Sequence, residues 1–278
     1  AKTLRNDNSS RFGKYIKVQF NEHCEIVGAQ ITNYLLEKSR IVHQPQNERN
    51  YHIFYQLFFG CDDEWRERLA LGTDTDSFAY LNQSGCTQVD SINDVDGEEL
   101  SFKETMDAMQ AMNVSDEERE FIFCVLGAVL HLGNVDFELD DGGDGHRGGH
   151  EGAAVPTRCL DALDTTAQLF SVDASRLGHV LRHRQRRVGP ETVESPLKPG
   201  EAVQMRNALA KAVYDRLFSW LVHRINGTIA RLNMKNGCFI GILDIYGFED
   251  LNPNGFEQLF INYANEKLQS LFNEHIFK

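Results

Sequence analysis

Toward its carboxyl end the chain reads Cys238-Phe-Ile-Gly-Ile-Leu-Asp-Ile-Tyr-Gly-Phe-Glu249, a short apolar run followed at once by an acidic motif. An apolar run of this length, bounded by turn signals, is typical of a strand covered on both faces, although length alone leaves a buried helix open. In an α/β sheet, ligands bind beyond the carboxyl ends of strands. Asp244 is therefore a candidate for holding a nucleotide-bound magnesium ion, against the commoner case of an aspartate that caps the next turn. Gly247 favours the first interpretation, because glycine lets a backbone N–H approach a phosphate closely.

A second polar motif lies near the start of the sequence, Asn6-Asp-Asn-Ser-Ser-Arg-Phe-Gly-Lys14. It combines two adjacent hydroxyls, two amides and an arginine. Magnesium prefers oxygen ligands, and hydroxyls can also position a water molecule for attack. Taken alone, such a segment is more often a surface turn, so the motif gains meaning only beside the first one.

The region after this motif is rich in strand-forming residues. Tyr15-Ile-Lys-Val-Gln-Phe20 and residues 26–36 have β-branched and aromatic content and flank a polar turn, which predicts a hairpin over residues 15–36. From residue 48 to 232 the spacing is mainly helical. Within that region, Ser101-x-x-Glu104 and Ser115-x-x-Glu118 have the capping-box pattern, which predicts a helix start at each.

Two further helices are expected toward the carboxyl end. One starts near Pro199 and carries apolar residues four apart, which predicts a buried stripe of Met205, Leu209, Val213, Leu217, Leu221 and Ile225. The other, residues 255–278, has an amphipathic face and ends without a capping signal, so we expect the chain to stop inside it. Residues 140–153 are polar and glycine-rich, which predicts a surface loop to which the sequence assigns no role.

Composition excludes several classes of protein. Hydrophobic residues make up 41% of the 278 residues, which argues against disorder. The formal net charge is −13, and residues 90–151 hold 17 acidic against three basic residues, so nucleic-acid binding is not expected. None of the six cysteines forms a CxxC pair, which favours a reducing compartment, and we expect a cytoplasmic protein. No signal peptide or membrane-spanning run is evident, so direct membrane insertion is not expected.

Together these motifs resemble one family, the myosin motor heads, over essentially the whole chain. Residues 6–14 resemble its switch I, residues 244–249 its switch II and residues 255–278 its relay helix. Residues 37–52 and Asn207-Ala-Leu-Ala-Lys211 resemble segments of the upper half of the head. The resemblance implies a partial motor domain over residues 1–278, with a P-loop NTPase-type α/β fold that is mainly helical and contains a central-sheet strand.

The resemblance also implies an activity. The complete protein would hydrolyse ATP with Mg²⁺ and move on actin filaments, and it would be located in the cytoplasm on the cytoskeleton. Its partners would be actin and the remainder of the motor head. A non-catalytic actin-binding pseudo-motor or scaffold is the alternative, but the two unbroken motifs, residues 6–11 and 244–249, favour the motor.

Specific roles follow from the same resemblance. The implied hydrolytic residues are Ser9, Arg11, Gly247 and Glu249; the implied nucleotide contacts are Asn6, Ser10, Asp244 and Gly247; the implied magnesium ligands are Ser10 and Asp244. Arg11 and Glu249 would form a salt bridge that closes the nucleotide pocket, with Ser9 helping to position the attacking water. Asn265 would link switch II to the relay helix, and Phe277 would lie where that helix kinks.

Departures from the family pattern bear on the isolated chain. It contains no GxxxxGK[ST] phosphate-binding loop, which the family carries upstream of switch I. Both ends look cut, and the main actin-binding half, converter and lever arm of a myosin are absent. We therefore expect a fragment that is inactive alone. Asn207 replaces the usual aspartate of its motif, which we interpret as a tolerated surface change.

A last expectation concerns actin. Glu191 lies 16 residues before Asn207. In myosins this position belongs to an actin-facing loop and is acidic or phosphorylatable, so Glu191 would supply the negative charge permanently. The nearby run Arg182-His-Arg-Gln-Arg-Arg187 is either a patch that steers actin or a solvated helix end, whose dipole also favours cations.

Overall fold

The computed structural model describes residues 1–87, 95–140, 152–189, 191–230, 238–250 and 254–277. The chain divides into two compact units. The first unit consists of Ala1–Ser9 and Lys38–Thr228, and the second of Ser10–Glu37 and Ile229–Lys278. Most of the loop expected over residues 140–153 lies outside the described residues.

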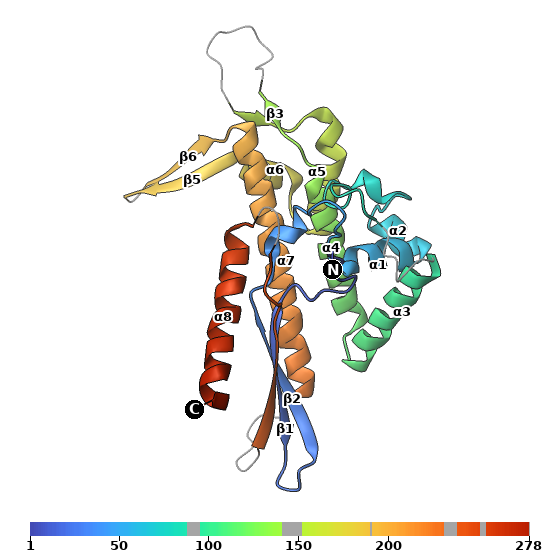
Figure 1. Ribbon diagram of the computed structural model, residues 1–278. Coiled ribbons are helices and arrows are strands. Elements are labelled where there is room, and N and C mark those ends of the chain that lie inside the picture. Colours follow the sequence, from blue (N-terminus) through green and yellow to red (C-terminus); the bar gives the residue numbers. More distant parts are fainter. Residues whose placement is uncertain (88–94, 141–151, 190, 231–237, 251–253, 278) are drawn as a thin grey trace. The chain divides into compact units, whose positions relative to one another are not determined.

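The first unit is mainly helical (Figure 1). Its helices are α1 (His52–Gly60), α2 (Asp63–Arg68), α3 (Val95–Ala111), α4 (Asp116–Gly133), α5 (Leu160–Leu169), α6 (Ala174–Arg182) and α7 (Pro199–Ile229). Two small antiparallel pairs accompany them, β3 (Glu138–Leu139) with β4 (Ala153–Ala154) and β5 (His183–Val188) with β6 (Glu191–Pro196). Short 3-10 turns cover Lys38–Ile41, Thr75–Ser77 and Thr157–Cys159.

The core of the first unit forms around α1 and α4. Helix α4 is buried almost continuously from Ile122 to Gly133, so it is covered on all sides rather than on one stripe. The ring of Phe123 packs edge-on against Trp65 at 5.3 Å between centroids and lies 5.8 Å from Phe102. Aromatic pairs of this kind add to the stabilisation that burial itself provides.

The two predicted helix starts have different outcomes. The capping box at Ser115 is confirmed, since its hydroxyl accepts from the Glu118 N–H and the Glu118 carboxylate accepts from the Ser115 N–H. The start predicted at Ser101 is wrong, because α3 already begins at Val95. Ser101 instead accepts a 2.6 Å hydrogen bond from Gln56 of α1, so a contact between distant residues decides its role.

The buried stripe predicted on α7 is largely wrong. Leu217 is buried, but the other five members of that row are only half-buried. The buried face is instead formed by Ala202, Ala210, Tyr214 and Leu217. Tyr214 explains the difference, because its ring stacks on Tyr51 at 5.2 Å and turns this face of the helix toward the core.

The second unit contains a three-stranded sheet and one helix. The strands are β1 (Gly13–Phe20), β2 (Ile26–Tyr34) and β7 (Cys238–Asp244), in the order β2-β1-β7 and antiparallel throughout. The helix is α8 (Phe256–Phe277). Asn21 closes the β1–β2 turn, since its side-chain oxygen accepts from the backbone N–H groups of His23 and Glu25.

One expectation about β7 is wrong. The sequence predicted a strand covered on both faces, yet every residue of β7 is exposed and β1 is its only partner among the described strands. The apolar composition of β7 therefore does not mean that the described part of this chain buries the strand.

Among the residues that the structure describes, no helix is long and apolar enough to cross a lipid bilayer.

Candidate functional site

The antiparallel pairing of β1 with β7 decides which loops meet in the second unit. Lys14 lies opposite Asp244 in the register, so the residues before β1 and those after β7 emerge at the same end of the sheet. Lys14 Nζ lies 3.1 Å from Asp244 Oδ2, and the aspartate side chain is about half exposed. Two motifs that are far apart in sequence thereby converge at one edge.

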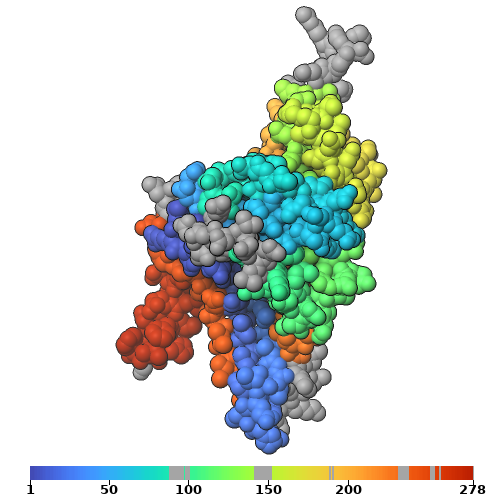
Figure 2. Space-filling model, turned by 90° about the vertical axis from the view of Figure 1, so that its right-hand side faces the viewer, coloured from blue at the N-terminus to red at the C-terminus, as the bar shows by residue number. Residues whose placement is uncertain are grey.

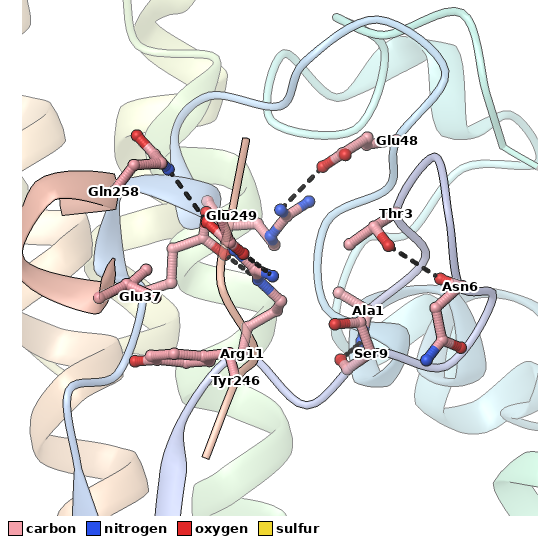
Figure 3. A network of polar contacts seen from close by, with 12 residues as sticks. Ala1, Thr3, Asn6, Ser9, Arg11, Glu37, Glu48, Tyr246, Glu249 and Gln258 are labelled. Carbon is pink, nitrogen blue, oxygen red and sulfur yellow. Dashed lines mark hydrogen bonds and ion pairs between the residues drawn. The ribbon is translucent and has the colours of Figure 1, made fainter. Parts of the chain in front are cut away.

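Arg11 is the centre of this edge (Figure 3). Its Nε lies 2.6 Å from Glu37 Oε2, and its Nη1 lies 2.6 Å from Glu249 Oε1. The side chains of these three residues are only 6%, 11% and 12% exposed. The guanidinium also lies 5.5 Å from the centre of the Tyr246 ring. The ion pair expected between Arg11 and Glu249 is thus present, together with a second carboxylate for which the sequence suggested no role.

The electrostatics of this cluster favour a charged arginine. Burial by itself lowers the pKa of the Arg11 guanidinium, but hydrogen bonding and charge from Glu37, and then from Glu249, raise that pKa above its ordinary value. Hydrogen bonds between two ionised groups are shorter and stronger than neutral ones. The cluster therefore holds a fixed positive charge between two fixed negative ones.

Helix α8 holds the segment that carries Glu249. The Glu249 N–H donates to Asn262 Oδ1 at 2.7 Å, and Asn262 Nδ2 donates back to the Glu249 carbonyl at 2.7 Å. Asn265 Nδ2 donates to the Tyr246 carbonyl at 3.0 Å. A displacement of residues 246–249 would therefore pull on α8 through two asparagines.

Sequence reasoning singled out Asn265 but missed Asn262 and Glu37. The signal for Asn262 was present, because residues three apart on a helix share one face, and Asn262 lies three before Asn265. Glu37 carried no such signal. Its role depends on the pairing of β1 with β2, which brings the segment after β2 beside the segment before β1.

The remaining expected site residues divide between the two units. Asn6 and Ser9 belong to the first, where Asn6 Oδ1 accepts from the Asn8 N–H at 2.9 Å and the Ser9 N–H donates to the Ala1 carbonyl at 2.8 Å. Ser10 and Gly247 belong to the second unit, and both are exposed. Apart from its immediate neighbours in sequence, no atom of the described residues lies within 4 Å of a Cβ added at Gly247. The space beside this backbone is therefore open to a ligand.

The oxygen donors of the second unit suit magnesium that arrives with a ligand. Ser10 and Asp244 offer the hard oxygen atoms that magnesium prefers. In the described part of the chain, no group of three His, Cys, Asp or Glu side chains lies together as a metal site would require. Two oxygen donors are fewer than the octahedral shell of magnesium requires, so other oxygen ligands would have to complete it.

Glu191 belongs to the first unit and Phe277 to the second. Glu191 is the exposed first residue of β6, opposite Val188 of β5. Helix α6 ends at Arg182, because residues 183–188 pair with β6. The basic run is therefore mostly a strand, and its interpretation as a solvated helix end is wrong. Phe277 is the last residue of α8, and its side chain is 79% exposed.

Comparison with known proteins identifies the class to which this arrangement belongs. The family described as myosin head (motor domain) matches residues 1–278. The chain belongs to this family.

Individual relatives agree along the whole chain. It is 48% identical over 278 residues to the myosin-I heavy chain of Dictyostelium discoideum, covering 100% of this chain and 11% of that protein. It is 44% identical over 278 residues to myosin-3 of Arabidopsis thaliana, covering 100% of this chain and 23% of that protein. It is 44% identical over 283 residues to unconventional myosin-Ic-A of Xenopus laevis, covering 100% and 26% respectively. The chain thus spans about a quarter or less of the length of these relatives.

Proposed function

We propose that the complete protein is a magnesium-dependent ATPase that moves on actin filaments, and that this chain supplies its switch I, its switch II and its relay helix. Membership of the motor-domain family supports the proposal. We further propose that the protein is part of the actin cytoskeleton, in the cytoplasm.

The observation that carries this proposal is the Arg11–Glu249 ion pair. It joins the segment before β1 to the segment after β7, and the second of these is hydrogen-bonded to α8. Phosphoryl transfer depends on positioning and charge stabilisation, so the closure of two loops can control it. The same closure would be transmitted to α8 through Asn262 and Asn265, with Phe277 at the far end of that helix.

Each remaining residue receives a separate role. We assign contact with nucleotide phosphates to Asn6 and to the Gly247 N–H, and orientation of the attacking water to Ser9. Magnesium would be bound by the Ser10 hydroxyl and, through water, by Asp244. When bound, this ion would neutralise phosphate charge. In the structure, Lys14 forms an ion pair with Asp244 and thereby offsets the charge of its carboxylate.

The non-catalytic alternative is not favoured. Both motifs are unbroken, and the chain matches motor heads over its whole length. For the chain taken alone we propose negligible ATP binding, because it has no GxxxxGK[ST] loop and would leave most phosphate charge uncompensated.

A single-turnover experiment on the full-length protein tests the proposal. ATP hydrolysis should require magnesium, and the steady-state rate should rise when actin filaments are added. Chelation of magnesium with EDTA should abolish the single-turnover phase. Hydrolysis that is unchanged by EDTA or by actin would contradict the proposed function. Actin binding without hydrolysis would instead favour the alternative, a non-catalytic pseudo-motor.

A further inference from the structure

Arg11 is linked twice to Glu37. Besides the 2.6 Å contact between Arg11 Nε and Glu37 Oε2, the Glu37 N–H donates to the Arg11 carbonyl at 3.0 Å. This backbone bond continues the β1–β2 hairpin past its last paired residues, Gly13 and Tyr34. Arg11 and Glu37 are therefore fixed to each other by the hairpin itself.

The contact with Glu249 is of a different kind. Glu249 follows β7, and its backbone is held by Asn262 of α8. Its carboxylate also accepts a 3.4 Å hydrogen bond from Gln258 of the same helix. Arg11 thus has one carboxylate from its own hairpin and another from a segment attached to α8.

We propose that Glu37 is a positioning residue for the closure of the nucleotide site. It holds Nε of Arg11 so that Nη1 faces the place that Glu249 occupies. The inference rests on the proposed function, because it concerns the same pair of closing loops.

The geometry of the guanidinium supports this role. Its donors lie in one plane in a fixed fork, so fixing Nε also fixes the direction of Nη1. A nearly buried arginine that loses its partner is strongly destabilising. Glu37 keeps the charge of Arg11 paired when Glu249 separates, and the arginine is then already oriented for the next closure.

Three variants of the full-length protein test the inference. Glu37→Met keeps the volume of the side chain but loses its oxygen acceptors, and Glu37→Gln keeps an acceptor for Nε without the charge. Glu22→Ala, at the turn of the same hairpin with a 73% exposed side chain, is the matched control. The measured quantities are the single-turnover hydrolysis rate and the ATP concentration that gives half of its maximum.

The expected result separates positioning from charge. Glu37→Met should lower the hydrolysis rate about tenfold, because misplacement of a positioned group by about 1 Å can cost up to about a hundredfold. The half-saturating ATP concentration should stay within about twofold. Glu37→Gln should retain the rate within about threefold, and Glu22→Ala should match the unmodified protein. In the Glu249→Ala background, Glu37→Met should produce no further loss, because the two residues act through the same contact.

Several outcomes would overturn the inference. A Glu37→Met rate equal to that of the unmodified protein would remove the positioning role, as would a Glu37→Gln rate as low as that of Glu37→Met. If Glu37→Met does not fold, Glu37→Asp takes its place, since it keeps the charge but is one methylene too short, and the same loss is expected. An inactive unmodified protein would instead contradict the proposed function, so the two failures are distinguishable.

Discussion

The two units place their apolar residues very differently. In the first, Phe54, Leu57 and Phe58 of α1 and Phe123 of α4 are all essentially inaccessible to solvent. In the second, large apolar side chains remain exposed along both β7 and α8. They include Phe239, Ile240, Ile242, Leu243, Phe256, Leu259, Phe260, Tyr263, Leu271, Phe272 and Ile276. The side chains of α8, in red, are visible on the surface in Figure 2.

This difference indicates what stabilises each unit. The first unit has a packed core of its own, whose stabilisation scales with the apolar area that it buries. The second depends more on strand pairing and on the polar cluster around Arg11. Substitutions in the core of the first unit should therefore change stability, whereas substitutions in the polar cluster around Arg11 should change hydrolysis.

The largest effect on stability should come from the core of the first unit. In the full-length protein, Phe123→Ala should cost about 3–5 kcal/mol, because it leaves a cavity against Trp65 and Phe102. Phe121→Ala on the same helix is the matched control, since Phe121 is 50% exposed and should cost about 1 kcal/mol or less. Urea unfolding measures both. If Phe272→Ala on α8 proved as costly as Phe123→Ala, other parts of the full-length protein would cover α8, and the contrast would belong to this chain alone.

The second unit should show its effect in chemistry. Arg11→Glu or Glu249→Arg alone should lower single-turnover hydrolysis about a hundredfold, because each places like charges at a buried contact. The double exchange should recover part of this loss. Recovery should stay incomplete, because Glu37 remains beside position 11 and would face a glutamate there. No recovery at all, in a folded protein, would mean that the pair does not work as a unit.

A smaller effect should appear when the pH is lowered, and it belongs to the first unit. Burial lowers the pKa of the His52 imidazole from 6.5 to about 3, and burial also lowers the pKa of His131. The unfolded chain takes up protons near pH 6.5 that the folded chain does not accept. Stability that is present above pH 6.5 is therefore lost progressively between pH 6.5 and 3.

Part of the loss due to His52 should already be present at pH 5, because this pH lies between the two pKa values. Comparison of unfolding free energies at pH 7 and pH 5 measures it. His52→Gln should reduce the pH dependence, while His23→Gln, at an exposed position of the β1–β2 turn, should not. An unchanged pH dependence in His52→Gln would refute the assignment.

Local signals in the sequence predicted local structure well. The capping box at Ser115 was predictable because all its atoms lie within one turn of the chain. Ser101 shows the same pattern, but its hydroxyl contacts Gln56 of another helix, and no local pattern contains that information. The prediction of the buried face of α7 was wrong for the same reason, because Tyr214 packs on Tyr51, which is far away in the sequence.

The residues of the candidate site show the same difference between local signals and contacts of distant residues. The two motifs around Arg11 and Glu249 could be recognised from the sequence because each is contiguous and resembles a known family. Glu37 could not, because it becomes a partner of Arg11 only once β1 and β2 have paired in the observed register. Asn262 could have been predicted from the sequence, because it shares a helix face with Asn265.

The smallest expected effect lies at the tip of the β5–β6 hairpin in the first unit. Glu191 is exposed there, and the facing strand β5 carries Arg184, Arg186 and Arg187. An exposed charge at the rim of an interface chiefly alters the rate of association with a charged partner. Glu191→Ala should therefore lower the actin-activated ATPase about two- to fivefold and leave the rate without actin nearly unchanged. Thr192→Ala, the neighbouring residue, should change neither rate. The loss should shrink as salt is raised, because screening weakens exposed charges. If both rates fell together in Glu191→Ala, the residue would matter for folding or chemistry, and its assignment to an actin-facing loop would be wrong.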